Sequence, residues 1–306
     1  MLYCLRERNS AKEVGSGSLD ATLHQLPRNA GAGSSRGITS SEAFGASTPH
    51  DSAVDLKFTS QILNPLVNSL LSVFFPVTCS LCQSVVEDLS LGVICQSCWR
   101  RVGPFRGILC TRCGYGFPST NIQSARPLCG GCRRSLFLFD FARAYSPFED
   151  PLKEIIHQFK YSSHPSLAKP LAHLLLSVYQ SNPQELSADL IIPVPLHRSR
   201  ERERGFNQAF ELSRQFSRLT RIPLPTRLLV RTRPTKVQAG LSRRERRINL
   251  RGAFEVSRSR VLEDKTVLLI DDVFTTGATL NECAKILKEH GALRINVLTL
   301  ARVIRG

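Results

Sequence analysis

The chain has 306 residues, of which 42% are hydrophobic, so it can bury a sizeable core and is expected to form one main domain and a smaller one. No apolar run reaches the roughly 18 residues that a membrane-spanning helix requires, which excludes a membrane span. The net charge of +16 is concentrated between residues 198 and 260, where eighteen Lys or Arg residues accompany five Asp or Glu. This local surplus indicates an anionic partner, either a polyphosphate ligand or a nucleic acid.

The first 60 residues are rich in Ser, Gly, Ala and Thr and show no sustained hydrophobic periodicity. Such a segment cannot bury enough apolar surface to offset its ordering entropy, so we expect a disordered extension over residues 1–60. A transit peptide is the weaker alternative, because this segment holds six acidic residues. Asn64 and Pro65 then form a helix-start pattern, and a short packing helix is expected over residues 61–75. No signal-peptide pattern opens the sequence, and a cytoplasmic location is expected.

Eight of the ten cysteines form four CxxC pairs within residues 76–136. A CxxC turn directs two thiolates at one cation, and two such turns complete a tetrahedral four-sulfur site. The order along the chain predicts two structural zinc ions in a double zinc ribbon, although a cross-braced pairing would have the same spacing. Disulfides or plain buried thiols are the competing interpretation, and the clustered spacing of an iron–sulfur ferredoxin is not seen. The predicted ligands are Cys79, Cys82, Cys95 and Cys98 for one ion, and Cys110, Cys113, Cys129 and Cys132 for the other.

From residue 137 to residue 306 strands alternate with helices, which predicts an α/β domain with a mostly parallel sheet. Apolar residues at helical spacing predict the helices, and short apolar runs predict the buried strands. The expected helices span residues 151–161, 166–179, 207–219 and 279–290, and the expected strands span residues 189–194, 267–270 and 295–300.

Residues 267–280 read VLLIDDVFTTGATL, so two adjacent carboxylates and a small-residue loop follow a buried strand. In an open parallel sheet, ligands bind beyond the carboxyl ends of the strands. Free backbone N–H groups, hydroxyls and the helix dipole at residues 275–279 suit a phosphate monoester. Asp271 and Asp272 would repel that phosphate, so we predict that they accept hydrogen bonds from a ribose diol. No Walker A or GxGxxG pattern is present, and two solvated acids beside a Thr-rich helix cap are the alternative.

This stretch resembles the signature with which type I phosphoribosyltransferases bind 5-phosphoribosyl-1-pyrophosphate (PRPP). Further motifs narrow the resemblance to the ComF family of competence-associated proteins, over roughly residues 63–306. The resemblance implies a type I phosphoribosyltransferase fold, a mostly parallel sheet flanked by helices, with a small N-terminal zinc-ribbon domain. The motifs beyond the zinc ribbon are Phe159-Lys160-Tyr161, Pro193-Val194-Pro195, Arg204-Gly205-Phe206-Asn207-Gln208, and the set Gln238, Leu241, Ser242, Arg246 and Asn249.

The resemblance also implies roles for individual residues. Asp271 and Asp272 would hold the ribose hydroxyls, with Mg²⁺ bridging the diol and the pyrophosphate. A loop at residues 193–204 would face the pyrophosphate, and a mobile flap at residues 231–249 would cover the site. The residues that would cradle the 5′-phosphate are Thr275, Thr276, Gly277, Ala278 and Thr279. The candidates for pyrophosphate and flap contacts are Arg198, Arg202, Arg204, Lys236, Gln238 and Arg246.

Two functions from different classes fit these features. One is a phosphoribosyltransferase that moves phosphoribose from PRPP to an unidentified nitrogen nucleophile and acts in DNA uptake. The other is a non-catalytic adaptor of the competence machinery that binds single-stranded DNA and keeps the loop only as a ligand-binding or structural element. The expected partners are therefore PRPP or a related ribose 5-phosphate ligand, single-stranded DNA and competence proteins.

Overall fold

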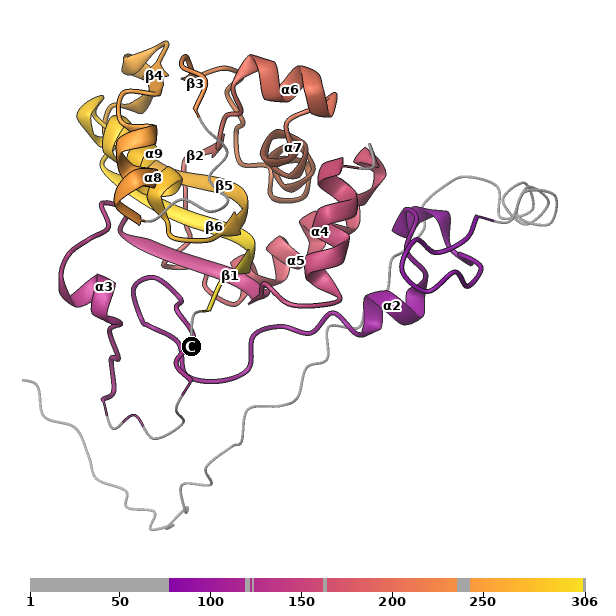
Figure 1. The fold of residues 1–306 in the computed structure, drawn as a ribbon. Coiled ribbons are helices and arrows are strands. Elements are labelled where there is room, and N and C mark those ends of the chain that lie inside the picture. The colour runs from indigo at the N-terminus through magenta and orange to yellow at the C-terminus, as the bar shows by residue number, and fades with distance from the viewer. Residues whose placement is uncertain (1–76, 119–121, 123, 162–163, 236–242, 305–306) are drawn as a thin grey trace, which may run out of the picture. The chain divides into compact units, whose positions relative to one another are not determined.

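The computed structural model describes residues 77–118, 122, 124–161, 164–235 and 243–304 (Figure 1). The extension expected over residues 1–60 and the helix expected over residues 61–75 lie outside these residues. All described elements belong to one compact unit, Val54–Gly306. Within the described part of the chain, every helix is too short or too polar to cross a membrane.

In the described residues, four parallel strands form the central sheet in the order β1-β6-β5-β2. Along β5, Leu268 and Ile270 enter the apolar core on one side of the sheet, and Val267 and Leu269 enter the core on the other side. Both faces are therefore covered, which explains why this strand is continuously apolar and not alternating. The strands are β1 (Phe141–Pro147), β2 (Leu190–Pro193), β5 (Thr266–Phe274) and β6 (Arg294–Arg302).

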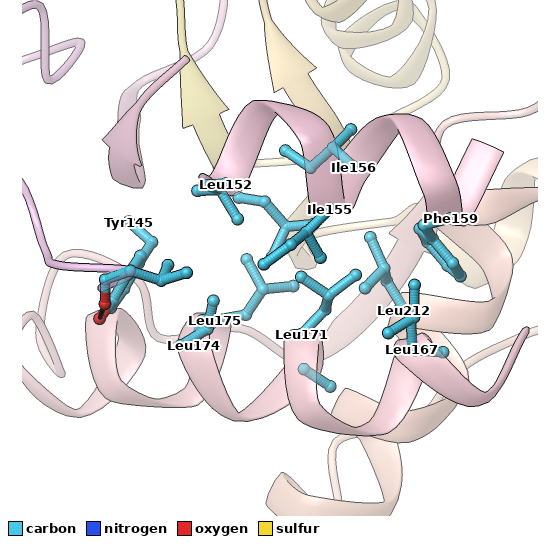
Figure 2. Packing of buried hydrophobic residues seen from close by; sticks show 14 of the residues in the cluster. Tyr145, Leu152, Ile155, Ile156, Phe159, Leu167, Leu171, Leu174, Leu175 and Leu212 are labelled. Carbon is cyan, nitrogen blue, oxygen red and sulfur yellow. Dashed lines mark hydrogen bonds between the residues drawn. The ribbon is translucent and has the colours of Figure 1, made fainter. Parts of the chain in front are cut away.

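Helices cover both faces of the sheet, as the sequence predicted (Figure 1). One face carries α4 (Leu152–Tyr161), α5 (Ala168–Gln180) and α7 (Gln208–Thr220), and the other carries α9 (Ala278–Glu289). Figure 2 shows how α4 packs: its buried side chains recur at intervals of three and four residues and meet leucines of α5 and α7. Each buried large aliphatic or aromatic side chain contributes about 1.5–3 kcal/mol, so this packing holds the end of α4 firmly in place.

Several elements were not predicted by hydrophobic periodicity, since they are short or strongly charged. A two-stranded antiparallel hairpin pairs β3 (Leu229–Arg231) with β4 (Phe254–Val256). The seven-residue edge strand β1 was missed for another reason: its buried positions form neither a regular alternation nor a continuous apolar run. The remaining elements are the helices α2 (Gln96–Arg100), α3 (Gly130–Arg133), α6 (Arg198–Arg204) and α8 (Arg243–Leu250), and the 3-10 turns η1 (Leu89–Leu91), η2 (Pro165–Leu167) and η3 (Ser259–Leu262).

The end of β5 corrects the sequence prediction, which stopped this strand at Ile270. The strand continues to Phe274, because β6 pairs with it as far as Arg302. The neighbour on the other side, β2, ends opposite Ile270 at Pro193. Asp271 and Asp272 therefore lie within β5, in the part that extends past the end of β2. From these two strand ends the chain leaves toward α7 on one face and α9 on the other, which is the geometry at which open α/β sheets bind ligands.

Candidate functional site

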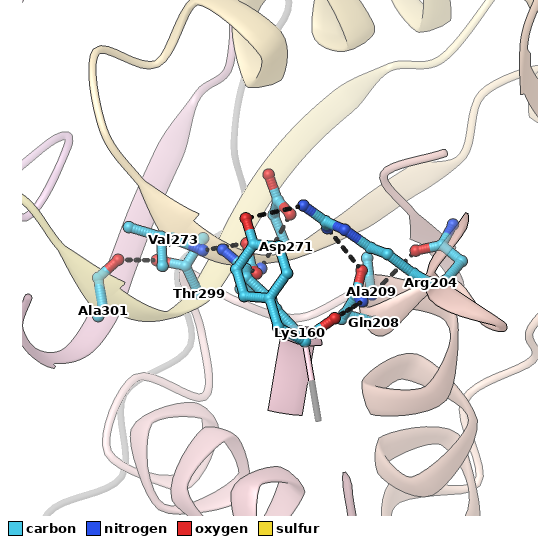
Figure 3. Close-up of polar contacts among 11 residues, drawn as sticks. Lys160, Arg204, Gln208, Ala209, Asp271, Val273, Thr299 and Ala301 are labelled. Carbon is cyan, nitrogen blue, oxygen red and sulfur yellow. Dashed lines mark hydrogen bonds and ion pairs between the residues drawn. The ribbon is translucent and has the colours of Figure 1, made fainter. Parts of the chain in front are cut away.

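The two adjacent aspartates of β5 have different surroundings. Asp272 is buried, and its Oδ2 lies 2.5 Å from Lys160 Nζ at the end of α4. Both side chains of this ion pair are largely shielded from solvent, at 19% and 12% exposure. Figure 3 shows Lys160 beside Asp271 with Arg204 and Gln208. A buried carboxylate needs such a partner, since removing a charge from water costs several kcal/mol unless it is paired. Lys160 therefore serves as the counter-ion of this acid pair.

The carboxyl of Asp271 is the less compensated of the two. Burial raises the pKa of Asp271 well above its usual range, and the charge of Asp272 raises it further. The backbone N–H of Asp272 and the Lys160 ammonium act in the opposite direction. A bound cation, or a hydrogen-bond donor, would stabilise the ionised carboxylate of Asp271 and offset the cost of its burial beside Asp272. Asp271 thus fits a site for a hydroxyl-bearing ligand accompanied by a divalent cation such as Mg²⁺.

Two motifs that are distant in sequence meet next to the acids. Arg204, at the end of α6, donates to Gln208 Oε1 at 3.1 Å and to the Tyr161 hydroxyl at 3.3 Å (Figure 3). Gln208 Nε2 lies 3.5 Å from the Lys160 carbonyl. Asn207 caps α7 by accepting from the N–H groups of Ala209 and Phe210. The network thereby holds the end of α4, and with it the Lys160 ammonium, against the start of α7.

The loop between β5 and α9 is built around Gly277. This residue has φ +77° and directly precedes α9, a helix of 12 residues. A Cβ at this position would lie 2.5 Å from Phe274 and 2.9 Å from Phe137, so both the backbone conformation and the packing require glycine. The Thr276 hydroxyl accepts from the Ala278 N–H at 3.4 Å, whereas Thr275 is exposed. Together with Thr279 in the first turn of α9, these residues present N–H and hydroxyl groups at a positive helix end.

The described candidates for pyrophosphate and flap contacts lie on two helices, α6 and α8. The segment expected as a loop at residues 193–204 is corrected in part, because residues 198–204 form the helix α6. On this helix Arg198 and Arg202 are exposed and Arg204 is half-buried. Arg246 lies in α8. Lys236 and Gln238 lie outside the described residues.

Two residues near the acids were absent from the predicted site. Lys160 belongs to the Phe159-Lys160-Tyr161 motif that supported the family resemblance. The sequence did not predict that its ammonium pairs with Asp272. Arg231, at the end of β3, has a buried Nε without a hydrogen-bond partner among the described residues. Burial lowers the pKa of Arg231, and the electrostatic effects of nearby Cys283 and Asp271 raise it in part. No local sequence signal distinguishes Arg231 from the many arginines around it.

The eight paired cysteines form two separate clusters in the structure. Cys79, Cys82, Cys95 and Cys98 form the first cluster, and Cys110, Cys113, Cys129 and Cys132 form the second. Within each cluster the sulfur atoms all lie within 4.8 Å of one another. The pairing is therefore sequential and not cross-braced.

The clusters fit tetrahedral metal sites. Sulfur–sulfur distances of 3.5 Å between Cys82 and Cys95 and 3.9 Å between Cys79 and Cys98 match the edge of about 3.8 Å expected for four thiolates around zinc. The Cys129 N–H donates to Cys110 Sγ at 3.3 Å, which is a contact typical of a thiolate ligand. The donor set and its geometry support structural zinc at both positions.

Comparisons with known proteins agree with this geometry. A model described as a phosphoribosyl transferase domain matches residues 161–306, and a model described as a double zinc ribbon domain matches residues 70–133. The chain is 34% identical to Competence protein F of Haemophilus influenzae over 233 residues, which cover 75% of this chain and 98% of that protein. It is 34% identical to the DNA utilization protein YhgH of Escherichia coli O157:H7 over 235 residues, covering 75% and 98% respectively. Competence protein ComFC of Bacillus subtilis is 28% identical over 220 residues, 68% of this chain and 84% of that protein. The chain therefore belongs to the ComF family of competence proteins, and combines a phosphoribosyltransferase-type domain with a double zinc ribbon.

Proposed function

We propose that this protein binds PRPP, or a related ribose 5-phosphate ligand, together with Mg²⁺ at the carboxyl end of β5. One observation carries the proposal: an acid pair, with Asp272 buried and Asp271 partly exposed, is followed within a few residues by a left-handed glycine loop that opens α9. The acids suit ribose hydroxyls, which donate hydrogen bonds, and the N–H groups of the loop suit the 5′-phosphate. The match of residues 161–306 to a phosphoribosyl transferase domain supports this assignment.

The reaction that this arrangement suits is phosphoribosyl transfer to a nitrogen nucleophile. The bond from C1′ to the pyrophosphate oxygen breaks and a C1′–N bond forms, so positive charge develops on the ribose ring. Asp271 and Asp272 would orient the ring through its hydroxyls and stabilise this charge, while residues 275–279 fix the phosphate. Arg198, Arg202 and Arg204 on α6, with Lys236, Gln238 and Arg246, are the proposed contacts of the pyrophosphate. Mg²⁺, held through ligand oxygens beside Asp271, would neutralise charge on the leaving group.

The experiment that tests the proposal is a calorimetric titration of the full chain with PRPP and Mg²⁺. Asp271→Asn combined with Asp272→Asn keeps the shape but removes the anionic acceptors, each of which contributes roughly 1.5–3 kcal/mol to a hydrogen bond. We expect the affinity to fall by at least about tenfold. A matched control changes the exposed pair at the opposite end of β5, Glu263→Gln with Asp264→Asn, and should leave the affinity unchanged. Absence of binding by the unmodified protein, or equal affinity in the site variant, would refute the proposal.

A second candidate function is the binding of single-stranded DNA as part of DNA uptake. The names of the relatives support such a role, and so does the excess of basic residues between positions 198 and 260. Arg198 and Arg202 are exposed on α6 and available to phosphates. Affinity for single-stranded DNA should then fall steeply as salt rises, and affinity insensitive to salt would argue against this function.

One pair of substitutions separates the two candidates. Arg198→Gln with Arg202→Gln removes two exposed charges from α6. If these arginines contact DNA, the slope of log K against log salt should decrease by about 1.4, since each lost phosphate contact on a single strand accounts for about 0.7. If they contact the pyrophosphate, PRPP affinity should fall while the salt slope stays the same.

We also propose that both Cys4 clusters hold zinc in a cytoplasmic protein. Eight thiols arranged as two metal sites suit a reducing compartment, where disulfides are rare. With four sulfur ligands each site is closed, so the metal would stabilise the fold and take no part in the reaction. Elemental analysis of the purified chain should find two zinc per molecule; iron in place of zinc, or no metal, would contradict this.

A further inference from the structure

The second Cys4 cluster contacts the end of β5 through one buried arginine. Arg302, the last residue of β6, is 6% exposed. Its Nη1 donates to the Cys113 carbonyl at 2.6 Å, and its Nη2 lies 3.4 Å from Cys113 Sγ. The same guanidinium stacks on Phe274, with Cζ 3.7 Å from the ring centroid. Phe274 is the last residue of β5 and contacts the position of the missing Cβ of Gly277. Arg302 therefore connects the metal ligand Cys113 to the loop at residues 275–279, which we call the phosphate loop.

A second connection runs through Phe137. A Cβ on Gly131, between the ligands Cys129 and Cys132, would lie 3.2 Å from the Phe137 ring, and one on Gly277 would lie 2.9 Å from it. Phe137 stacks on Phe139 at 4.9 Å between centroids and meets Phe274 edge-on at 5.9 Å. The next residue, Leu138, donates its N–H to Asn281 of α9 at 2.5 Å. The second cluster and the phosphate loop thus share a packed aromatic layer.

The first Cys4 cluster is connected to a different part of the protein. Cys79, Cys95 and Cys98 pack in the core on the α4, α5 and α7 side of the sheet, and Cys82 is exposed. Gly92, three residues before Cys95, approaches Leu167 so closely that a Cβ would lie 2.9 Å from its Cδ2. Leu167 ends η2 and directly precedes α5. The phosphate loop and the adjacent Phe274 instead pack in the other core, together with the second cluster.

From these contacts we infer that Arg302 and Phe137 are positioning residues for the phosphate loop, and that metal in the second cluster and phosphate ligand bind cooperatively. Metal binding fixes the Cys113 and Gly131 turns, these turns fix Arg302 and Phe137, and those side chains hold Phe274 and Gly277 in the ligand-binding conformation. Coupling of this kind is reciprocal, so the ligand must also raise the metal affinity of the second cluster by the same factor. The first cluster takes no part in it. The inference rests on the proposed function for the identity of its ligand.

The test uses the full zinc-loaded chain and ribose 5-phosphate with Mg²⁺ as the probe. Metal is removed with a chromophoric chelator, and the freed cysteines are identified by alkylation and mass spectrometry. At equilibrium, saturating ribose 5-phosphate should raise the chelator concentration that removes half of the metal from the second cluster by at least about fivefold, a typical coupling between sites. Loss from the first cluster should not change. Equal protection of both clusters, or of neither while the ligand binds, would overturn the inference.

Substitutions locate the coupling. Arg302→Met should weaken ribose 5-phosphate binding about tenfold and abolish the protection of the second cluster, and Arg302→Lys should restore part of both. The matched control is Arg143→Met: Arg143 donates to the carbonyls of Cys110 and Thr111 in the same ribbon but stacks on Phe141 at 3.9 Å instead of Phe274. This control should retain the protection. Equal behaviour of the Arg302 and Arg143 variants would overturn the role of Arg302.

A ligand-free measurement keeps the inference separate from the proposed function. Amide hydrogen exchange at residues 275–279 directly reports how well ordered the phosphate loop is. Exchange should rise at least about fivefold when the second cluster loses its metal, and also in a metal-loaded Arg302→Met chain. If the unmodified protein binds neither ribose 5-phosphate nor PRPP, the proposed function fails, and loop exchange alone decides the inference. Unchanged exchange in both experiments would refute it.

Discussion

Lys160→Met tests whether the ammonium of Lys160 is the counter-ion of the acid pair. The change removes the partner of Asp272, whose Oδ2 lies 2.5 Å from Nζ in a site where both side chains are at most 19% exposed. Removal of one partner of a buried ion pair costs about 3–5 kcal/mol. Both side chains keep some solvent contact, so we expect the lower end of this range, about 3 kcal/mol. For a domain of this size each kcal/mol corresponds to about 2–4 °C, which gives a decrease in Tm of about 6–12 °C.

The pH dependence of the stability loss in Lys160→Met shows whether charge repulsion causes it. Without Lys160, two adjacent carboxylates remain, one buried and one partly buried, and their repulsion exists only while both are ionised. Protonation in the folded state relieves it, so the variant binds more protons when folded than when unfolded, and its stability deficit should shrink as pH falls from about 7.5 to about 5. Calorimetric or chemical unfolding of the zinc-loaded chain at the two pH values measures this difference.

The control for this experiment lies on the same helix. Lys153 pairs with Asp150 at 3.9 Å, but these side chains are 52% and 67% exposed. Exposed pairs contribute about 0–1 kcal/mol, so Lys153→Met should change the Tm little. A deficit in Lys160→Met that is the same at both pH values would show that packing and not charge is responsible. A deficit no larger than that of Lys153→Met would refute the counter-ion role altogether.

Three further predictions concern the acids, the loop and the metal. Burial raises the pKa of Asp271, so the folded state holds this proton more tightly than the unfolded state; Asp271→Asn should therefore be more stable than the unmodified chain at pH 7, with an advantage that disappears as pH falls toward about 3.9, measured by denaturant unfolding. Gly277→Ala should lower stability by about 1–3 kcal/mol and weaken PRPP binding, since its Cβ would lie 2.5 Å from Phe274; unchanged binding in titration would contradict the loop assignment. Cys98→Ser should reduce the zinc content by one equivalent in elemental analysis while the second cluster stays loaded.

The sequence by itself predicted the parts of this protein that depend on local patterns. A CxxC pair brings two thiols together within one turn, so the eight ligands and two Cys4 sites could be predicted from spacing, whereas the structure decided which pairs combine. Apolar residues at three- and four-residue intervals predicted α4, α5, α7 and α9, and the run before Asp271 predicted a buried parallel strand. The charged helix α6 and the three-residue strands β3 and β4 were not predicted, because their apolar pattern is too weak to indicate a helix or a strand.

Tertiary structure alone decided which residues surround the acids and how far β5 extends. The strand runs past Asp271 and Asp272 because β6 continues beside it while β2 stops, and the length of a neighbouring strand is not encoded in the residues of β5. Lys160 meets Asp272 only because α4 and β5, far apart in sequence, pack against the same core. Arg302 likewise reaches both Cys113 and Phe274 only in the folded chain. Spacing along a chain determines contacts within one turn or one strand, whereas contacts between elements depend on how the whole sheet and its helices pack.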